Sequence, residues 1–166
     1  TFNVGNRIRL AHWGSEISYY VMNGGTLNVA NTLNVGWDGI GLFTLNDGLV
    51  NCLTLAVDGN GATGAIGGTN ETFSLYGGRI NIGTGGLTSA AAAGAYQVNL
   101  GGGTMGASAN WSSSLNLSLT NGPGVAFDTA DRTITLTGVL SGTNRLTKQG
   151  SGYLNLNNAA NTYSGP

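Results

Sequence analysis

Charged residues, cysteine, histidine and proline are all scarce in this sequence. Only 8% of the 166 residues are charged, against roughly 25% in typical soluble domains. The six basic residues are scattered and the formal net charge is -1, so the chain lacks the basic patch that binds nucleic acids or anionic membranes. No apolar stretch approaches the roughly 20 residues that span a bilayer. We therefore expect no nucleic-acid partner and no membrane insertion by this segment.

The few reactive side chains exclude several kinds of site. Cys52 is the one cysteine and His12 the one histidine, so an internal disulfide is impossible and a structural zinc site has too few ligands. Three of the seven acidic residues directly precede glycine, where turn formation is their ordinary role. No Gly-x-Ser-x-Gly elbow accompanies the histidine. We expect no cofactor and no enzyme activity, with a polysaccharide-active β-helix as a minor alternative.

Glycine, asparagine and threonine, by contrast, are abundant. The sequence holds 30 glycines, 20 asparagines and 19 threonines, so amides and hydroxyls must keep it in solution. Low charge combined with these residues is typical of extended extracellular β-proteins. The composition therefore favours an extracellular or cell-surface location.

Hydrophobic residues alternate with polar ones almost throughout, which is the pattern of β-strands. Four similar units begin at Tyr20, Phe43, Phe73 and Tyr96, at spacings of 23, 30 and 23 residues. The longer interval contains a glycine-rich stretch near residues 58–69, which predicts a projecting loop. A nearly constant period of this length indicates a repeat architecture, in which each unit buries its apolar face against its neighbours.

A finer repeat consists of an asparagine between two apolar residues. Alternate side chains of a strand point to opposite faces, so the apolar pair is expected to face inward and the asparagine outward, where stacked amides form ladders. The asparagines of these triplets are Asn3, Asn28, Asn34, Asn81, Asn99, Asn116 and Asn155.

These periodicities predict one domain over residues 1–166, all-β, folded as a parallel β-solenoid, and the general preference of parallel connections makes it right-handed. A coil of about 23 residues gives about seven coils for this length. The alternative is an antiparallel β-sandwich, in which the same glycine turns would be hairpins. The regular spacing favours the solenoid, because a sandwich has no reason to keep equivalent residues in register.

The stretch "LTKQGSGYLNLNNAANTYSG", residues 146–165, resembles the autotransporter-associated β-strand repeat. The matching residues are Leu146, Thr147, Lys148, Gly150, Gly152, Leu154, Leu156, Asn161, Thr162, Tyr163 and Gly165. This resemblance covers about 20 residues. It implies a right-handed parallel β-helix of a large secreted bacterial passenger protein, with a structural or adhesive role.

Three sets of residues are candidate sites. Asp128 and Asp131 in "DTADR" form the nearest thing to an acidic cluster, suited to a weak ion or polar site, although calcium requires six to eight oxygens. Trp37 and Trp111 are candidates for stacking on sugars, against the alternative that they close the core. Asn-x-Ser/Thr sequons at Asn70, Asn110 and Asn116 are possible glycosylation sites.

Together these features predict a structural subunit of an extracellular or cell-surface bacterial assembly. An open solenoid end exposes unpaired backbone groups, so we expect self-association end to end into a filament or fibre. Two alternatives remain: a segment of a larger autotransporter-like adhesin, and a β-helix that binds or cleaves carbohydrate, for which surface polysaccharide would be the partner.

Overall fold

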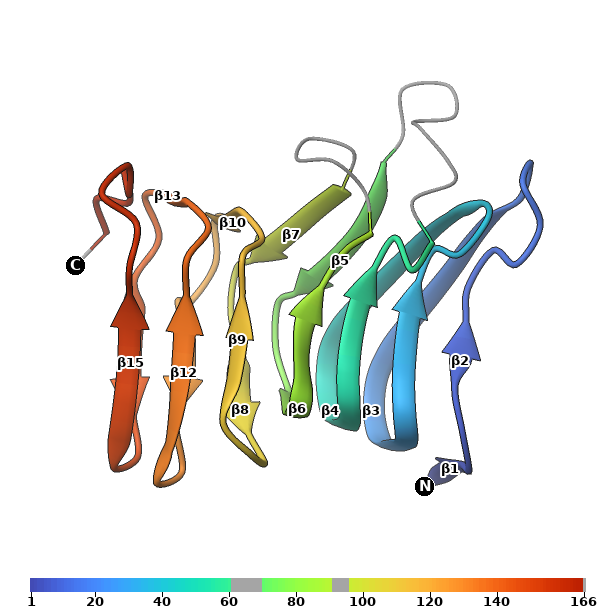
Figure 1. Ribbon diagram of the computed structural model, residues 1–166, viewed down its shortest axis with the longest axis horizontal. Helices are drawn as coiled ribbons and strands as arrows, with labels where there is room; N and C mark the ends of the chain where they lie inside the picture. Colours follow the sequence, from blue (N-terminus) through green and yellow to red (C-terminus); the bar gives the residue numbers. More distant parts are fainter. Residues whose placement is uncertain (61–69, 91–95, 166) are drawn as a thin grey trace.

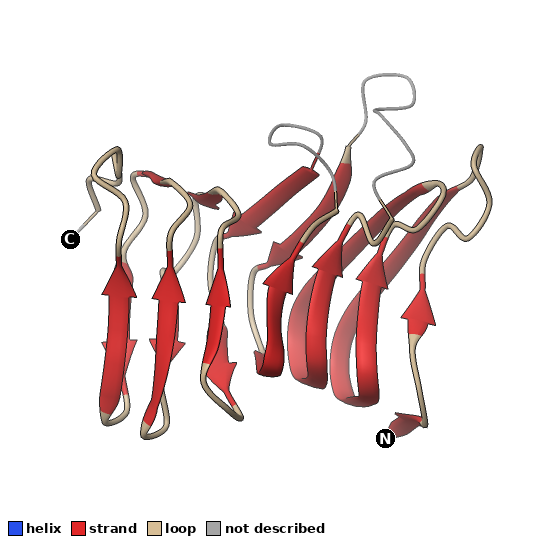
Figure 2. Cartoon of the chain, in the orientation of Figure 1, coloured by secondary structure: helices blue, strands red, loops and turns tan. Residues whose placement is uncertain are grey.

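The chain folds as a β-solenoid of about six turns, seen in a computed structural model (Figure 1). The structure describes residues 1–60, 70–90 and 96–165, and these form strands and loops without a helix (Figure 2). None of the described residues therefore belongs to a helix that could cross a membrane. The strands are β1 Phe2–Val4, β2 Ile8–Arg9, β3 Ile17–Val35, β4 Ile40–Val57, β5 Glu71–Leu75, β6 Arg79–Thr88, β7 Tyr96–Leu100, β8 Thr104–Ala107, β9 Trp111–Ser113, β10 Leu117–Leu119, β11 Val125–Asp128, β12 Arg132–Leu136, β13 Leu140–Gly142, β14 Leu146–Gln149 and β15 Gly152–Leu156.

Every strand pairing among the described residues is parallel, which confirms the predicted solenoid and excludes the antiparallel sandwich. Each coil contributes to three faces. We call them the aromatic face, the ladder face and the third face. The aromatic face contains part of β3 (residues 17–22), part of β4 (residues 40–45), and the whole of β5, β7, β10 and β13. The ladder face contains β1, part of β3 (residues 27–29), part of β4 (residues 50–52), part of β6 (residues 79–82), and the whole of β8, β11 and β14. The third face contains β2, the last residues of β3, β4 and β6, and the whole of β9, β12 and β15.

The core is a set of columns of inward side chains that stack from coil to coil. On the aromatic face Tyr20, Phe43 and Phe73 lie in register, with ring centroids 5.0 Å and 5.9 Å apart. Phe43 and Phe73 are almost completely buried, and stacked rings of this kind add to the free energy of burial. The first three predicted repeat units therefore do lie one above another.

The fourth predicted unit is out of register by two residues. Tyr96 pairs with Glu71, while Phe73 pairs with Val98. The period that starts at Phe73 is thus 25 residues and not the predicted 23. Tyr96 and Val98 both face inward, so either one fits the alternation as the first residue of the unit. The prediction placed the start at Tyr96 because the three preceding units also begin with an aromatic residue.

Strands β3 and β4 pass from face to face without interruption. They run for 19 and 18 residues and change direction at shifts of register, for example between Val29 and Thr32. Such bulges bend a strand while keeping it in the sheet. At the bend between the aromatic and ladder faces, Gly48 has a φ of 98°, and a Cβ there would lie 2.7 Å from the carbonyl oxygen of Gly25. Glycine is therefore required at this close approach between successive coils.

The stretch that resembles the autotransporter repeat forms the last coil. It comprises β14, β15 and a tail in which the backbone N–H groups of Thr162 and Ser164 donate to carbonyls of β13 over 2.9 Å. The motif's Gly150 has a φ of 70°, and a Cβ on Gly165 would lie 2.0 Å from the carbonyl oxygen of Asn144. Of the predicted glycine-rich loop near residues 58–69, the part at 61–69 lies outside the described residues.

Candidate functional site: an asparagine ladder beside a groove

Outward asparagines on the ladder face form a continuous row of amides. The strand register places Asn3, Asn28, Asn51 and Asn81 directly above one another. Each amide nitrogen donates to the side-chain oxygen of the preceding coil, over 2.7 Å from Asn28 to Asn3 and 2.8 Å at each of the next two steps. The parallel register repeats the same side chain at each level, so that one donor and one acceptor meet at every step.

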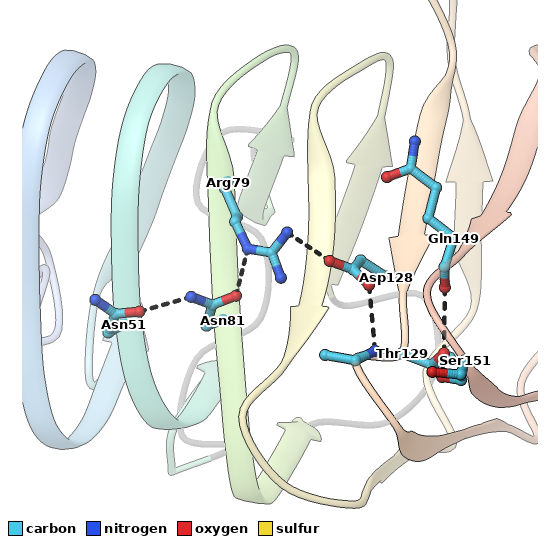
Figure 3. A network of polar contacts seen from close by, with 8 residues as sticks. Asn51, Arg79, Asn81, Asp128, Thr129, Gln149 and Ser151 are labelled. Atoms are coloured by element: carbon cyan, nitrogen blue, oxygen red, sulfur yellow. Dashed lines mark hydrogen bonds and ion pairs between the residues drawn. The ribbon is translucent and has the colours of Figure 1, made fainter.

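The next coil carries no side chain at this position, and Arg79 bridges the gap. Gly106 follows Asn81 in register and Asp128 follows Gly106. The Arg79 guanidinium donates from Nε to Oδ1 of Asn81 over 2.6 Å and from Nη1 to Oδ2 of Asp128 over 2.8 Å (Figure 3). The row of polar side chains therefore continues across the glycine as an ion pair.

Gly106 is needed for this bridge. A Cβ at that position would lie 2.2 Å from Oδ1 of Asn81 and 2.6 Å from Nη2 of Arg79. No side chain fits beneath the guanidinium unless it moves. The hydrogen bond from Arg79, together with its positive charge, holds the pKa of Asp128 below its ordinary value. The backbone N–H of Ala130 donates to the other oxygen of Asp128 over 3.2 Å, so both carboxylate oxygens are engaged.

A second group of asparagines joins neighbouring coils through the backbone. The side-chain oxygens of Asn110, Asn116 and Asn161 each accept a backbone N–H of an adjacent coil over 2.8 to 2.9 Å. Nδ2 of Asn144 donates to the carbonyl oxygens of Gly101 and Thr120 over 2.9 and 2.6 Å. These bonds satisfy backbone groups in the bends or near the start of strands β12 and β13.

A groove of about 580 Å³ runs beside the amide row. The residues Asn3, Asn28 and Asn51 line it, together with the small outward residues Gly5 and Ala30. Leu53, Gly83 and Ser108 continue the lining over the next coils. The groove lies where the strands bend from the ladder face to the third face, next to the bulges after Val29 and Cys52. It therefore crosses several coils, perpendicular to their strands.

Cys52, which also lines the groove, is nearly inaccessible. Its side chain is 5% exposed and belongs to the core, as predicted. Burial raises the pKa of this thiol to about 12, so the thiolate is absent near neutral pH. No group of three or more histidine, cysteine, aspartate or glutamate side chains lies close enough to hold a metal ion within the described ranges.

The two candidate acidic residues lie in different surroundings. Asp128 bonds to Arg79, as described above, whereas Asp131 lies in an exposed turn with a φ of 66° and accepts a hydrogen bond from the hydroxyl of Ser151. Sequence reasoning found Asp128 but not Arg79, its partner, because 49 residues separate them. Two other carboxylates, Asp58 and Glu71, are fully buried and have partners; nothing in the sequence pattern distinguished them.

The two candidate tryptophans have little ring surface open to a ligand. Trp111 is 4% exposed and belongs to the core. Trp37 is half-buried, and the guanidinium carbon of Arg9 lies 3.9 Å from the centre of its ring, which covers one face. Trp13, by contrast, is 67% exposed beside His12, with ring centroids 5.0 Å apart. The exposed indole is therefore not one of the two that we singled out.

The sequon asparagines are placed as follows. Asn110 and Asn116 are exposed, and each side-chain oxygen accepts a backbone N–H of the next coil. Asn70 is half-buried. Asn116 also belongs to a predicted triplet, yet it lies in the bend before β10 and not in a strand.

Comparison with protein-family models, with curated proteins and with solved structures found no match for this chain.

Proposed function

We propose that this protein is a structural component of an extracellular or cell-surface assembly, built by adding further coils to the solenoid. The observation that carries the proposal is the open edge of the aromatic face. Residues 17–22 of β3 pair with β4 on one side, and no described residue pairs with them on the other. A row of unpaired N–H and C=O groups is a template for another strand.

The outward side chains of this edge are apolar. Ile17, Tyr19 and Val21 are 41%, 70% and 57% exposed. Natural proteins usually protect an edge with charged residues, proline or a covering segment, and this strand carries neither charge nor proline. A further parallel strand would cover these side chains in part, as the neighbouring coils cover the half-buried Leu42 and Thr44, and would complete the backbone bonds.

In this proposal a second copy supplies the covering coil. Its last coil presents the tail at Thr162–Ser164 on the aromatic face, in the position that a following strand would pair with. Such a contact joins unlike ends and does not close, which produces filaments. The resemblance of residues 146–165 to the autotransporter-associated repeat supports this proposal, because that stretch forms a regular coil of its own.

A larger autotransporter-like adhesin is the second candidate. The same resemblance favours it, because that repeat belongs to long passenger proteins. In that case the covering coil belongs to the same chain. The two candidates differ in the mass of the assembling chain and in whether association depends on concentration.

A charge on the edge strand tests the first candidate. Val21→Lys places an ammonium group on the open edge, and we expect it to abolish association in sedimentation velocity. Thr44→Lys is the matched control, because Thr44 pairs with Val21 one coil further in and also faces outward. Association that survives Val21→Lys as well as it survives Thr44→Lys would contradict the proposed edge contact.

A further inference from the structure

The groove beside the amide row has the chemistry of a ligand site. Its lining contains no charged side chain, and its long direction follows the solenoid axis over five consecutive coils, from the level of Asn3 to that of Ser108. At about 4.8 Å per coil this is a length of about 19 Å. An occupant must therefore be neutral, extended and several units long.

The amides along the groove retain free hydrogen-bonding capacity. Asn28 uses one N–H to bond Asn3 and accepts one N–H from Asn51. An amide has two N–H donors and two acceptor positions, so Asn28 keeps one of each, and so does Asn51, which is bonded in the same way. The ladder fixes every amide in the same orientation. The free groups therefore recur once per coil.

These properties disfavour the commoner kinds of extended ligand. A polyanion would find no cation in the lining. A peptide strand would find no open backbone at the level of the amide row, because Asn28 and Asn51 lie in strands paired on both sides. An acyl chain would match the apolar part of the lining, but it would remove the amides from water without replacing their hydrogen bonds, which is costly.

We propose that the groove binds a neutral linear polysaccharide. Sugar hydroxyls would pair with the amides of Asn3, Asn28 and Asn51, while the C–H faces of the rings cover Ala30 and Leu53. This combination of apolar contact with a few placed polar groups is what ligand sites generally use. The site differs from the two tryptophans considered first and is independent of the proposed assembly.

The test uses soluble hexasaccharides of β-1,4-glucan, β-1,3-glucan, β-1,4-xylan, β-1,4-mannan and chitin as probes. Calorimetry measures affinity, and NMR of the asparagine side-chain amides locates the binding. We expect at least one probe to shift the amide signals of Asn28 and Asn51. Hexagalacturonate is the charged counterpart and should leave them unchanged.

A variant of the groove tests the location without disturbing the core. Ala30→Ile adds bulk to an exposed outward position of β3 and should weaken binding at least tenfold. Ala30→Gly keeps the groove open and should bind as the wild type does. Ser118→Ile adds an isoleucine at an outward position of β10 on the aromatic face and should also leave affinity unchanged. Circular dichroism verifies that each variant is folded.

Several results would overturn the proposal. These are no binding of any of the five neutral probes, equal affinities for Ala30→Ile and wild type, or amide shifts confined to residues outside the groove. Tighter binding of an extended peptide or of a zwitterionic phosphatidylcholine vesicle at the same amides would assign the groove to another class of ligand and would overturn it too.

Discussion

The two halves of the ladder face carry different side chains at the same outward position, and these side chains form their hydrogen bonds in different ways. In the first coils four asparagines bond one another directly. In the later coils the equivalent positions are Gly106, Asp128 and Gln149, and an arginine from an earlier strand spans the glycine. The first half needs only repetition of one residue. The second needs three particular residues, Arg79, Gly106 and Asp128, to be present together.

The core of the last coil also differs from that of the middle coils. Phe43, Phe73 and Ile80 of the earlier coils are fully buried, whereas Leu146, Leu154 and Leu156 of the last coil are only partly buried. Each coil is sealed by the coils on either side of it, so the last one lacks half of its contacts. Stability is therefore expected to fall from the middle of the solenoid toward this end.

Truncation of a core residue should show the largest difference between the halves. Phe73→Ala removes a fully buried ring from the aromatic column and should lower the free energy of unfolding by about 3–5 kcal/mol. Leu154→Ala, in the exposed last coil, should lower it by about 1–2 kcal/mol. Denaturant titration of both variants makes the comparison. Equal losses would mean that the last coil is as well packed as the middle.

A methyl group beneath the arginine bridge should have the next largest effect. Gly106→Ala places a Cβ against the side-chain oxygen of Asn81 and the guanidinium of Arg79, and loss of the hydrogen bonds of the displaced guanidinium should lower the free energy of unfolding by about 1–2 kcal/mol. Gly5→Ala is the control, because nothing lies within 4 Å of its Cβ; it should change stability by less than about 0.5 kcal/mol. Thermal unfolding measures both. A neutral Gly106→Ala would show that the bridge is not required.

Removal of one amide from the row should cost about 1–2 kcal/mol. Asn51→Ala leaves the side chains of Asn28 and Asn81 each without one partner in a half-buried position. Asn99→Ala is the matched control, since that outward amide makes no side-chain hydrogen bond within the part of the chain that the structure describes. The two variants are compared by denaturant titration. Similar losses would mean that the ladder adds nothing to ordinary strand stability.

The ion pair should have a smaller effect that depends on pH. Asp128 and Arg79 are 20% and 35% exposed, so Asp128→Asn should lower stability by about 0.5 kcal/mol at neutral pH. Because the folded pKa of Asp128 is lowered, its contribution is present above the unfolded pKa and is lost as pH falls through the folded value. The variant should therefore lose less stability than the wild type on acidification. Identical pH profiles would contradict the pairing.

The alkylation rate of the Cys52 thiol should measure how often the early coils open, and the measurement requires no substitution. Burial and the raised pKa of this thiol predict slow alkylation by iodoacetamide at neutral pH, rising only when the early coils open. In mild denaturant the last coil should loosen while Cys52 stays protected. Rapid alkylation of the native protein would show that the early coils are not the more stable part.

The fold was largely predictable from the sequence because it repeats at two short intervals, the alternation of apolar and polar residues along a strand and the spacing of one coil from the next. Alternation of apolar and polar residues defines inward and outward sides, and the spacing from Tyr20 to Phe43 and Phe73 places three aromatic rings in one column. The outward asparagines followed from the same rule. Asn51 was not among the predicted triplets because Cys52, and not an aliphatic residue, follows it. Asn34 departed from the rule, since it is buried and donates to the carbonyl oxygen of Ile8 over 3.2 Å.

The candidate site was much less predictable. The Arg79–Asp128 pair spans two coils, and the glycine between its members carries no signal of its own. The groove arises where Gly5 and Ala30 stack at a bend, and the position of that bend depends on bulges that leave no clear pattern in the sequence. Burial of Trp111 depends on the coils around it. Chemistry that depends on contacts between coils can be found only once the register is known.

The most direct test of the assembly proposal is electron microscopy of the purified native protein, with the intact mass recorded on the same sample. The account predicts filaments of uniform width, composed of chains whose mass matches 16.8 kDa and lengthening with concentration. Discrete particles of unchanged size at every concentration would contradict it, and would show that the edge at residues 17–22 does not recruit a second copy.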